Sequence, residues 1–361
     1  MSNKTISSNS KRIIWIDAAK FAAITAVLVD HTYGILYKNE SVFRLSYFSI
    51  SVFILLMGIT TFLSFQKNGT HISRKILSIT LPYITATFIT CIIKYQSFDF
   101  EIFINHLIHF NACPPYYYVL LYIQLVVVSP ILFKYLQITG CKQISLFYDI
   151  LMTIPVLFLS SWTTNHSNIL SIYGGGGKLL GGSYLLLLYI GMCFGKYYYR
   201  INMGKWISLL LLSVISLLLI TWGYVISQYY YILDGKQFLG GGANPPGFTL
   251  ILFAILITGF FYTIGSIVNL YPESPAAKFF SVLSIPGKHT LYIFLYHWLF
   301  LDFLINPNIE SLYRSGHFTR LVRILCFLVL MIGPVFAEYI LKLIHKSLAA
   351  CYKKQQVIIQ K

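Results

Sequence analysis

Charged residues are scarce in this chain, and no polar stretch is long enough to form a soluble domain. They make up 11% of the 361 residues, against roughly 25% in a typical soluble protein. This balance excludes a globular enzyme with a short membrane anchor. The formal net charge of +16 does not indicate a nucleic-acid partner, because a basic patch on a folded soluble face has nowhere to form.

The six cysteines have no paired or metal-like spacing, so they are expected to be small core residues. His106 and His109, in a stretch 98–110 expected to be an interfacial amphipathic helix, have no further ligand nearby, and no metal is expected. The glycine-rich runs 174–182 and 240–247 lack the context of Walker or dinucleotide sites. They are predicted to be flexible outer loops or, alternatively, the mouth of an acceptor cleft.

Long apolar runs dominate the sequence. Apolar residues make up 57% of the chain and aromatic residues 17%, as expected where aromatic rings line two membrane interfaces. A helix needs about 20 predominantly apolar residues to cross a bilayer. We therefore expect an all-α, polytopic integral membrane helix bundle with about ten transmembrane helices. Their expected ranges are 13–36, 43–65, 76–94, 117–137, 144–162, 181–199, 206–230, 248–269, 289–305 and 318–341.

The distribution of Lys and Arg predicts the orientation of this bundle. With the N-terminus in the cytoplasm, about two-thirds of the basic residues fall in inner segments, as the positive-inside rule requires. Both termini are then cytoplasmic, and the long connections 95–116 and 163–180 face outward. Lys4, Lys11 and Arg12 precede a first run that is too long for a cleavable signal peptide, so this run is expected to be a signal anchor.

The first apolar run carries ionisable side chains that are costly in a membrane. Within 13–36 stand four of them: Asp17, Lys20, Asp30 and His31. A charge at mid-membrane costs roughly 2.5–3.5 kcal/mol, so such groups usually face a cavity or a partner. At about 100° per residue, Asp17, Lys20 and His31 share one helix face, with His31 about 16 Å beyond Lys20. The alternative is a water-lined structural helix with satisfied charges.

Two further groups of residues are candidates for a site. Arg74 and Lys75 open the third expected span at its cytoplasmic edge, and Lys288 precedes the ninth. Each is either a positive-inside anchor or a ligand for an anionic phosphate. His297 lies midway along the ninth span. It is either a neutral core histidine bonded to a neighbouring helix or part of the chemistry.

The segment from Arg12 to Lys20, with His31 eleven residues further on, resembles the first-helix signature of the membrane acyltransferase family 3. These proteins are bacterial O-acyltransferases of cell-surface glycans, and the signature is a basic residue, ten intervening residues and a histidine. The family often has arginine where this chain has Lys20. Weaker matches follow in the family's order, at 53–58, 74–83, 116–130 and 290–297.

The resemblance implies transfer of an acyl group, expected to be acetyl, from cytosolic acyl-CoA to a glycan hydroxyl, with acetyl-CoA as co-substrate and no metal. His31 is the expected base, because the ordinary pKa of histidine, about 6.5, suits proton transfer at neutral pH. Lys20 and Asp17 are expected to order the donor channel, and His297 is the second candidate base. The expected donor-phosphate ligands are Arg74, Lys75 and Lys288.

The implied organisation is a cytoplasmic segment at 1–12, a transmembrane acyltransferase domain at 13–341 and a basic cytoplasmic tail at 342–361. The expected partners are acyl-CoA, a glycan or lipid-linked sugar acceptor and the lipid bilayer, without nucleic acid. The expected location is the bacterial inner membrane. The alternative function is a transporter or flippase of a glycan or lipid-linked sugar. Many carriers consist of two halves with inverted topology. The sequence shows no such internal repeat, which argues against this alternative.

Overall fold

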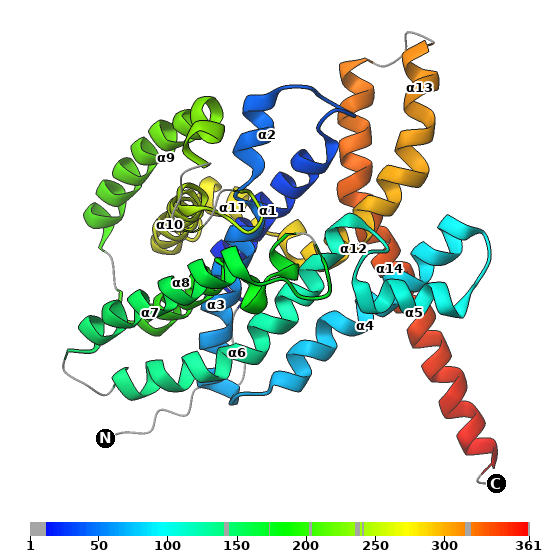
Figure 1. The fold of residues 1–361 in the computed structure, drawn as a ribbon, viewed down its shortest axis with the longest axis horizontal. Coiled ribbons are helices and arrows are strands. Elements are labelled where there is room, and N and C mark those ends of the chain that lie inside the picture. Colours follow the sequence, from blue (N-terminus) through cyan, green and yellow to red (C-terminus); the bar gives the residue numbers. More distant parts are fainter. Residues whose placement is uncertain are drawn as a thin grey trace.

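The computed structural model describes residues 12–140, 144–172, 174–201, 204–234, 239, 242–314 and 319–359. Within these ranges the chain is helical and contains no β-strand, as expected for an all-α protein (Figure 1). The α-helices are α1 (Ile14–Thr32), α2 (Glu40–Ser46), α3 (Ser49–Asn68), α4 (Ile72–Tyr95), α5 (Phe100–His109), α6 (Tyr117–Gly140), α7 (Ser145–His166), α8 (Tyr184–Tyr197), α9 (Lys205–Asp234), α10 (Phe248–Leu270), α11 (Pro275–Leu283), α12 (Thr290–Leu299), α13 (Asn306–Arg314) and α14 (Arg320–Ile359). The short turns are η1 (Pro114–Tyr116), η2 (Gly175–Gly177), η3 (Leu179–Gly181), η4 (Pro286–Lys288) and η5 (Phe300–Ile305).

Seven stretches of helix in the described residues are long and apolar enough to cross a membrane. The expected count of about ten is therefore supported only in part, although each of the ten predicted ranges contains a helix. The seven candidate spans are Glu40–Asn68, Ile72–Tyr95, Pro114–Gly140, Ser145–His166, Lys205–Tyr229, Phe248–Leu270 and Arg320–Leu343.

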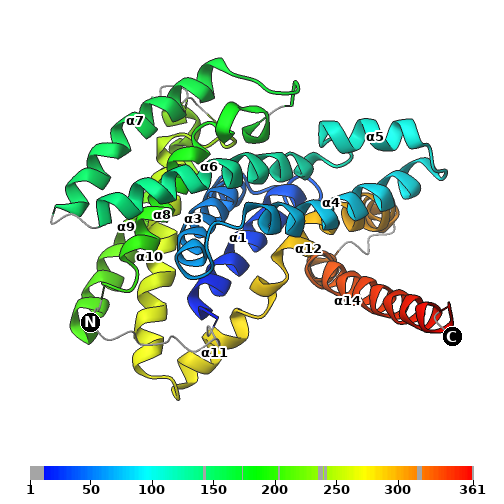
Figure 2. The ribbon, with the colours of Figure 1, turned by 90° about the horizontal axis from the view of Figure 1, so that it is seen from below.

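The other three predicted spans correspond to α1, α8 and α12, which are short or charged. α8 and α12 have 14 and 10 residues, and α1 carries Asp17, Lys20 and Asp30 within 19 residues. All three lie inside the bundle, and α1 lies between α3 and α12 (Figure 2). Ala19 and Ala23 of α1 are fully buried. Neighbouring helices therefore surround the charged first helix over most of its length.

α3 packs closely against α8 on one side and contacts α1 on another. A Cβ on Gly58 would lie 2.4 Å from the backbone oxygen of Leu188, and one on Gly191 would lie 2.3 Å from that of Leu55. Small residues let helix backbones approach closely in a membrane, where van der Waals packing drives helix association. Because α3 also packs against α1, this contact supports the helix that carries the predicted site.

The glycine-rich segment 174–182 is packed into the protein instead of forming the loose loop that was expected. The backbone N–H of Gly175 donates to Asn244 Oδ1 at 3.0 Å, and Gln124 donates from Nε2 to the carbonyl of Gly176 at 2.9 Å. These bonds tie the segment to α6 and to the second glycine-rich run. Gly240 and Gly241 of that second run lie outside the described residues.

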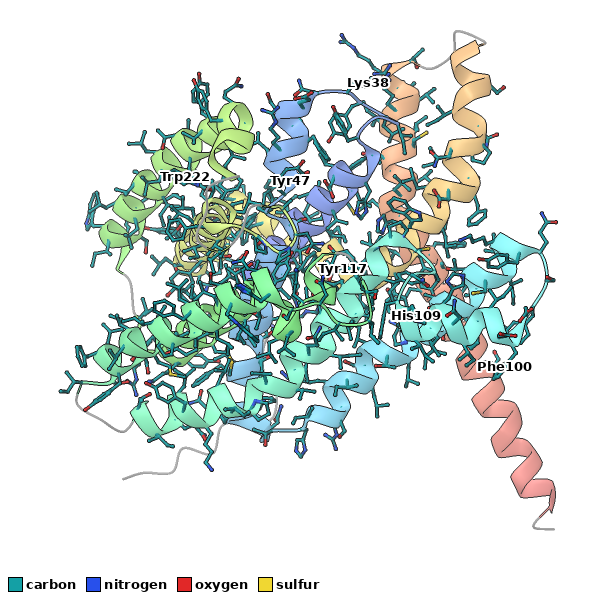
Figure 3. All side chains as sticks on the ribbon, viewed as in Figure 1. Lys38, Tyr47, Phe100, His109, Tyr117 and Trp222 are labelled. Carbon is teal, nitrogen blue, oxygen red and sulfur yellow. The ribbon has the colours of Figure 1, made fainter. Side chains whose placement is uncertain are left out.

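The expected interfacial helix at 98–110 is α5, which lies at the periphery of the bundle. The side chain of Asp99 accepts hydrogen bonds from the first backbone N–H groups of α5, as an N-cap does. Phe103 is buried against the protein, whereas Phe100 is 67% exposed (Figure 3). One face of α5 therefore presents apolar side chains outward, in keeping with an interfacial position.

The last helix continues beyond the expected domain boundary at residue 341. α14 has 40 residues, so it is about 60 Å long at 1.5 Å per residue. The hydrocarbon core of a bilayer is only about 30 Å thick. The predicted tail therefore continues the helix as far as Ile359 and projects from the bundle (Figure 1).

Candidate active site

The candidate site lies between α1 and α12, which run in the same direction. Near the start of these helices, Lys20 and Thr290 line one cavity. At their ends, His31 and His297 are in contact. The polar face predicted for α1 thus faces α12 along its length.

His31 and His297 form a hydrogen-bonded pair. Nδ1 of His31 lies 2.7 Å from Nε2 of His297, and the two rings stack with centroids 5.0 Å apart. His297 is fully buried, whereas the His31 side chain is 21% exposed. The sequence offered both residues as candidate bases but gave no sign that imidazoles 266 positions apart meet.

The hydrogen-bond partners assign the protons in this pair. Nδ1 of His297 lies 2.9 Å from the backbone oxygen of Ile293, which only accepts, so this nitrogen carries hydrogen. With both rings neutral, Nε2 of His297 then accepts from the Nδ1–H of His31. The lone pair of His31 is left on Nε2, the nitrogen that does not face His297.

Two residues that sequence reasoning did not assign to the site complete the surroundings of His31. Oδ2 of Asp30 lies 3.7 Å from Nε2 of His31. The ring of Trp298 stands perpendicular to that of His31, with centroids 5.0 Å apart, and its Nε1–H donates to Asp302 at 2.6 Å. Two signals were available in the sequence: Asp30 is an ionisable residue within the first apolar run, and Asp30 and Trp298 directly adjoin the two histidines.

The chain after His297 departs from a regular helix. The sequence predicted one span over 289–305, but Phe300–Ile305 form the π-helical turn η5. Such turns are rare and occur frequently at functional sites. Asp302, the partner of Trp298, lies in this turn, so η5 supports the ring that covers His31.

Asp17 binds two cations near the start of α1. Its carboxylate accepts a hydrogen bond from Nε of Arg12 at 2.5 Å and lies 4.0 Å from Nζ of Lys20. A Cβ on Gly287 would lie 1.8 Å from the backbone oxygen of Asp17, so glycine is required for η4 to pack against α1 here. Asp17 is thus placed to orient Lys20, and it lies about 21 Å from His31 along the helix.

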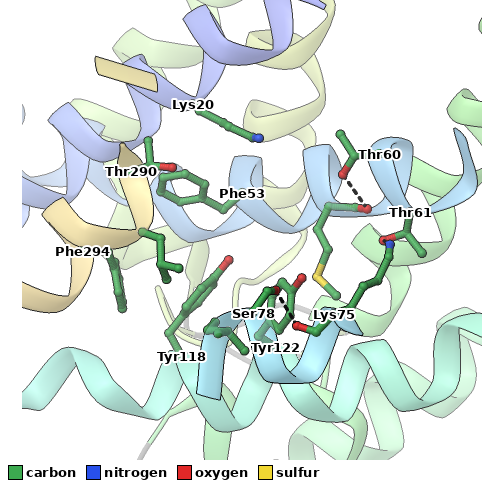
Figure 4. Close-up of a pocket in the computed structure, with 13 residues that line it drawn as sticks. Lys20, Phe53, Thr60, Thr61, Lys75, Ser78, Tyr118, Tyr122, Thr290 and Phe294 are labelled. Carbon is green, nitrogen blue, oxygen red and sulfur yellow. Dashed lines mark hydrogen bonds between the residues drawn. The ribbon is translucent and has the colours of Figure 1, made fainter. Parts of the chain in front are cut away.

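A cavity of about 220 Å³ lies beside Lys20 (Figure 4). Side chains of α1, α3, α4, α6 and α12 line it. Lys20 and Lys75 reach the cavity from different helices, and the hydroxyl groups of Thr60 and Ser78 also line it. The cavity therefore combines positive charge with hydrogen-bonding groups inside an otherwise apolar bundle.

The three predicted phosphate ligands occupy different positions. Lys75 lines the cavity, donates to Oγ1 of Thr61 at 2.9 Å and lies 4.6 Å from the ring centroid of Phe65. Arg74 and Lys288 are exposed and do not line it. Each of them precedes a lining residue by one or two positions, which keeps their charges near this end of the bundle.

Two aromatic rings stand between the cavity and the histidine pair. Tyr118 and Phe294 both line the cavity, and their ring centroids are 4.8 Å apart. The ring of Phe294 also lies 6.1 Å from that of His297. About one turn of α12 therefore separates the cationic cavity from the histidines.

Residues 13–340 match the protein family described as acyltransferase domain, acyltransferase family 3. The chain belongs to this family. No curated protein and no solved structure matches the chain. Membership of acyltransferase family 3 confirms the resemblance carried by Lys20 and His31, and it identifies a membrane acyltransferase. The matched range contains every residue of the cavity and of the histidine pair.

This family 3 acyltransferase also buries an ion pair that the sequence did not reveal. Nζ of Lys196 lies 2.6 Å from Oδ2 of Asp149, and both side chains are less than 5% exposed. Tyr197 donates to the same oxygen at 2.7 Å, and Thr139 donates to the other at 2.8 Å. The cluster joins α6, α7 and α8, so Lys196 holds these helices together through a buried ion pair.

Among the described residues, no group of three or more His, Cys, Asp or Glu side chains could hold a metal ion. The two histidines of α5 have other partners. His106 contacts the hydroxyl of Tyr95 at 2.9 Å and Oδ1 of Asn111 at 2.7 Å. His109 contacts the backbone oxygen of Asn105 at 2.9 Å.

Proposed function

We propose that the protein is an integral-membrane O-acetyltransferase. It moves an acetyl group from cytosolic acetyl-CoA to a hydroxyl of a cell-envelope or exported glycan. The observation that carries the proposal is the arrangement along α1, with a cationic cavity at one end and a hydrogen-bonded histidine at the other. The family supplies the reaction class, and the chemistry of these residues supports the remaining steps.

The cavity fits the thioester arm of acetyl-CoA better than the whole donor. Its volume of about 220 Å³ is below the roughly 300–1,000 Å³ of pockets that enclose a drug-sized ligand. The acetyl group and the adjoining arm enter the cavity, and the phosphates remain at its mouth. Lys75 inside, with Arg74 and Lys288 nearby, supplies the positive charge for charge-assisted hydrogen bonds to phosphate.

His31 acts as the general base in this proposal. Its Nε2 takes the proton of the acceptor hydroxyl while the oxygen attacks the carbonyl carbon of the thioester. The carbon–sulfur bond of the tetrahedral intermediate then breaks, and the sulfur leaves with the proton held by His31. The products are an acetyl ester and free CoA thiol, and His31 returns to its neutral state.

The neighbours of His31 support this proton transfer. His297 accepts the Nδ1–H of His31 and so keeps Nε2 directed away from the pair. The carboxylate of Asp30, 3.7 Å from Nε2, stabilises the positive charge that the ring acquires. The ring of Trp298 covers one side of the imidazole and excludes water, which would otherwise hydrolyse the thioester.

Lys20 and Asp17 order the donor channel below His31. Lys20 brings a positive charge into the cavity, where it attracts the polar groups of the donor. Asp17 lies 4.0 Å from the ammonium group and restricts its position. Both residues act on the donor rather than on the acceptor proton.

We place both termini on the cytoplasmic side of a bacterial inner membrane, in line with the bias of Lys and Arg. In this orientation Lys20 and Lys75 lie toward the cytosolic donor. His31 then lies toward the outside, where a glycan or lipid-linked sugar is available as acceptor. The other partner is the lipid bilayer, and no nucleic acid takes part.

The competing function is a transporter or flippase of the glycan itself. Membership of an acyltransferase family favours the enzyme, and so does a histidine whose lone pair is held in place by a second histidine. A transporter needs a path for a whole sugar between its helices. The cavity beside Lys20, at about 220 Å³, is small for that purpose.

The test uses purified protein in lipid nanodiscs with radiolabelled acetyl-CoA and envelope glycan. Ester-linked label is released by mild base and counted. We expect base-labile label on the glycan with the wild-type protein and none with His31→Ala. Transport of glycan across vesicle membranes without any labelling would support the transporter instead.

A further inference from the structure

The face of α1 opposite His31 carries two adjoining hollows that together form a groove. Two hollows of about 420 and 450 Å³ lie along this face. Both hollows are lined by Val29 and Val42, so they lie next to each other along α1. Together they extend from Ala18, near the first turn of α1, to Leu36, just beyond its last turn.

The walls of this groove, which we call the α1 groove, are almost wholly apolar. The hollow nearer the start of α1 is lined by α2, α10 and α11, with Leu45, Phe261 and Leu283. The hollow nearer the end of α1 is lined by α14, with Ile324 and Phe327. An apolar groove among membrane helices is filled by hydrocarbon, because water would gain no hydrogen bonds there.

Two cations lie at the end of the α1 groove that is nearest the last turn of α1. Arg320 and Arg323, in the first turn of α14, line the same hollow as Thr32, and Thr32 directly follows His31 in α1. Guanidinium groups bind phosphate through paired, charge-assisted hydrogen bonds. The groove therefore combines an apolar channel with a binding site for a phosphate at its end.

The length of the α1 groove indicates which lipid it holds. From Ala18 to Thr32, α1 rises about 21 Å, more than the roughly 15 Å that one leaflet of a 30 Å hydrocarbon core provides. The acyl chains of a phospholipid are paired and occupy one leaflet. A single groove that continues past mid-membrane fits one long, unpaired chain.

We propose that the α1 groove binds the acyl acceptor through its lipid carrier, a polyprenyl phosphate linked to the sugar. The polyprenyl chain lies along α1, and the phosphate meets Arg320 and Arg323. A sugar attached to this phosphate is held at the end of α1 that carries His31. The inference rests on the proposed function and narrows its acceptor to a lipid-linked sugar.

Binding of a fluorescent polyprenyl phosphate to the protein in nanodiscs tests the phosphate site. The double variant Arg320→Gln/Arg323→Gln is expected to weaken binding about tenfold or more, since hydrogen bonds to charged groups are worth roughly 1.5–3 kcal/mol. The control Lys94→Gln/Lys205→Gln removes two exposed cations away from the groove and is expected to leave binding unchanged. Normal binding by the arginine variant overturns the proposal.

A second variant tests the apolar channel without altering the arginines. Ala22 lines the groove and is only partly buried, so Ala22→Trp is expected to fill the channel and to weaken binding of the same probe. Leu217→Trp is the control, because Leu217 is 63% exposed on α9. A melting temperature close to that of the wild type shows that each variant is folded. Normal binding by folded Ala22→Trp overturns the proposal.

Competition distinguishes the carrier lipid from an ordinary anionic lipid. An excess of unlabelled polyprenyl phosphate is expected to displace the probe, and the same amount of phosphatidylglycerol is not. Equal displacement by the two lipids would make the α1 groove a general phospholipid site and overturn the proposal.

The experiments distinguish a failure of the proposed transferase mechanism from a failure of the proposed lipid-carrier site. If His31→Ala abolishes transfer while the arginine variant binds the probe normally, the transferase stands and the groove is not the acceptor site. If His31→Ala retains transfer while the arginine variant loses the probe, the proposed mechanism fails, and the groove is a lipid site without the assigned role in the reaction.

Discussion

At the scale of single residues, His31 and His297 have different tasks in the proposed site: His297 holds the ring of His31 in position, and His31 takes the proton. His297 is fully buried and has both ring nitrogens occupied, by Ile293 and by His31. His31 is partly exposed and keeps one nitrogen for a proton. The buried ring of His297 therefore positions the ring of His31, and only His31 is placed to meet the hydroxyl group of an acyl acceptor.

Replacing His31 by alanine is expected to abolish transfer while the protein still folds. General-base assistance is typically worth about 10²–10⁴-fold in rate. The measurement is the initial rate of base-labile acetyl transfer at saturating acetyl-CoA. The matched control is His109→Ala, which removes a partly exposed histidine of α5 and should leave the rate unchanged. A folded His31→Ala protein with more than about a tenth of wild-type activity would rule His31 out as the base.

Replacing His297 is expected to lower kcat with little effect on the KM for acetyl-CoA. His297→Ala removes the acceptor for the Nδ1–H of His31, and we expect a loss of about 10²-fold, at the low end of general-base effects. His297→Gln retains an oxygen that can accept this hydrogen bond and should recover part of the rate. Equal losses for the two variants would point to packing rather than hydrogen bonding as the role of His297.

The side chain at position 20 is expected to require a positive charge. Lys20→Ala removes the cation from the cavity and should strongly reduce transfer, whereas Lys20→Arg keeps the charge and should be tolerated best. The control is Lys67→Ala, since Lys67 is exposed at the end of α3. Steady-state kinetics with varied acetyl-CoA decide the matter. Activity that is the same in Lys20→Ala and Lys20→Arg would contradict a role for the charge.

At the scale of structural elements, short and irregular helices carry the site. α12 has 10 residues and ends in the π-helical turn η5, and α1 has three charged groups that lipid would not accept. Long apolar helices around them provide the membrane-facing surface. α8 and α12 are missing from the candidate spans because they are too short to cross a bilayer, and α1 because of its charged residues.

The start of α4 is expected to bind the phosphates of the donor. Arg74→Gln/Lys75→Gln removes two positive charges there and should raise the apparent KM for acetyl-CoA much more than it lowers kcat, because charge-assisted bonds to phosphate act in substrate binding. The two single variants separate the effect of Lys75, which lines the cavity, on the KM from the effect of the exposed Arg74. An unchanged KM in the double variant would leave both residues as topology anchors.

At the scale of the whole molecule, the direction of the bundle in the membrane decides which substrate meets which end of α1. We expect Lys38, in the connection after α1, to face outward and Asn68, at the end of α3, to face the cytoplasm. In a background without the native cysteines, Lys38→Cys should react with a membrane-impermeant thiol reagent in intact cells, and Asn68→Cys only after lysis. The reverse pattern would place the cationic cavity on the outer side and contradict the proposed donor path.

Sequence periodicity and composition predicted much of this molecule, but only features that are local along the chain. The spacing of Lys20 and His31 on one face follows from helix geometry. The hydrogen bond to His297 and the ion pair of Asp149 with Lys196 join distant segments, so no local pattern reveals them. The π-helical turn after α12 has no composition signal of its own, because its side chains would also suit a regular helix.

The separation of the two histidines in the chain also bears on how the protein is made. At about 5–20 residues per second, the 266 positions between His31 and His297 are synthesised over tens of seconds. During that time α1 is in the membrane without α12, and its charged groups lack the helix that covers them. The nascent chain must therefore shield α1 with its own early helices or with an insertion factor, and a polypeptide that ends before residue 297 lacks the hydrogen-bond partner of His31.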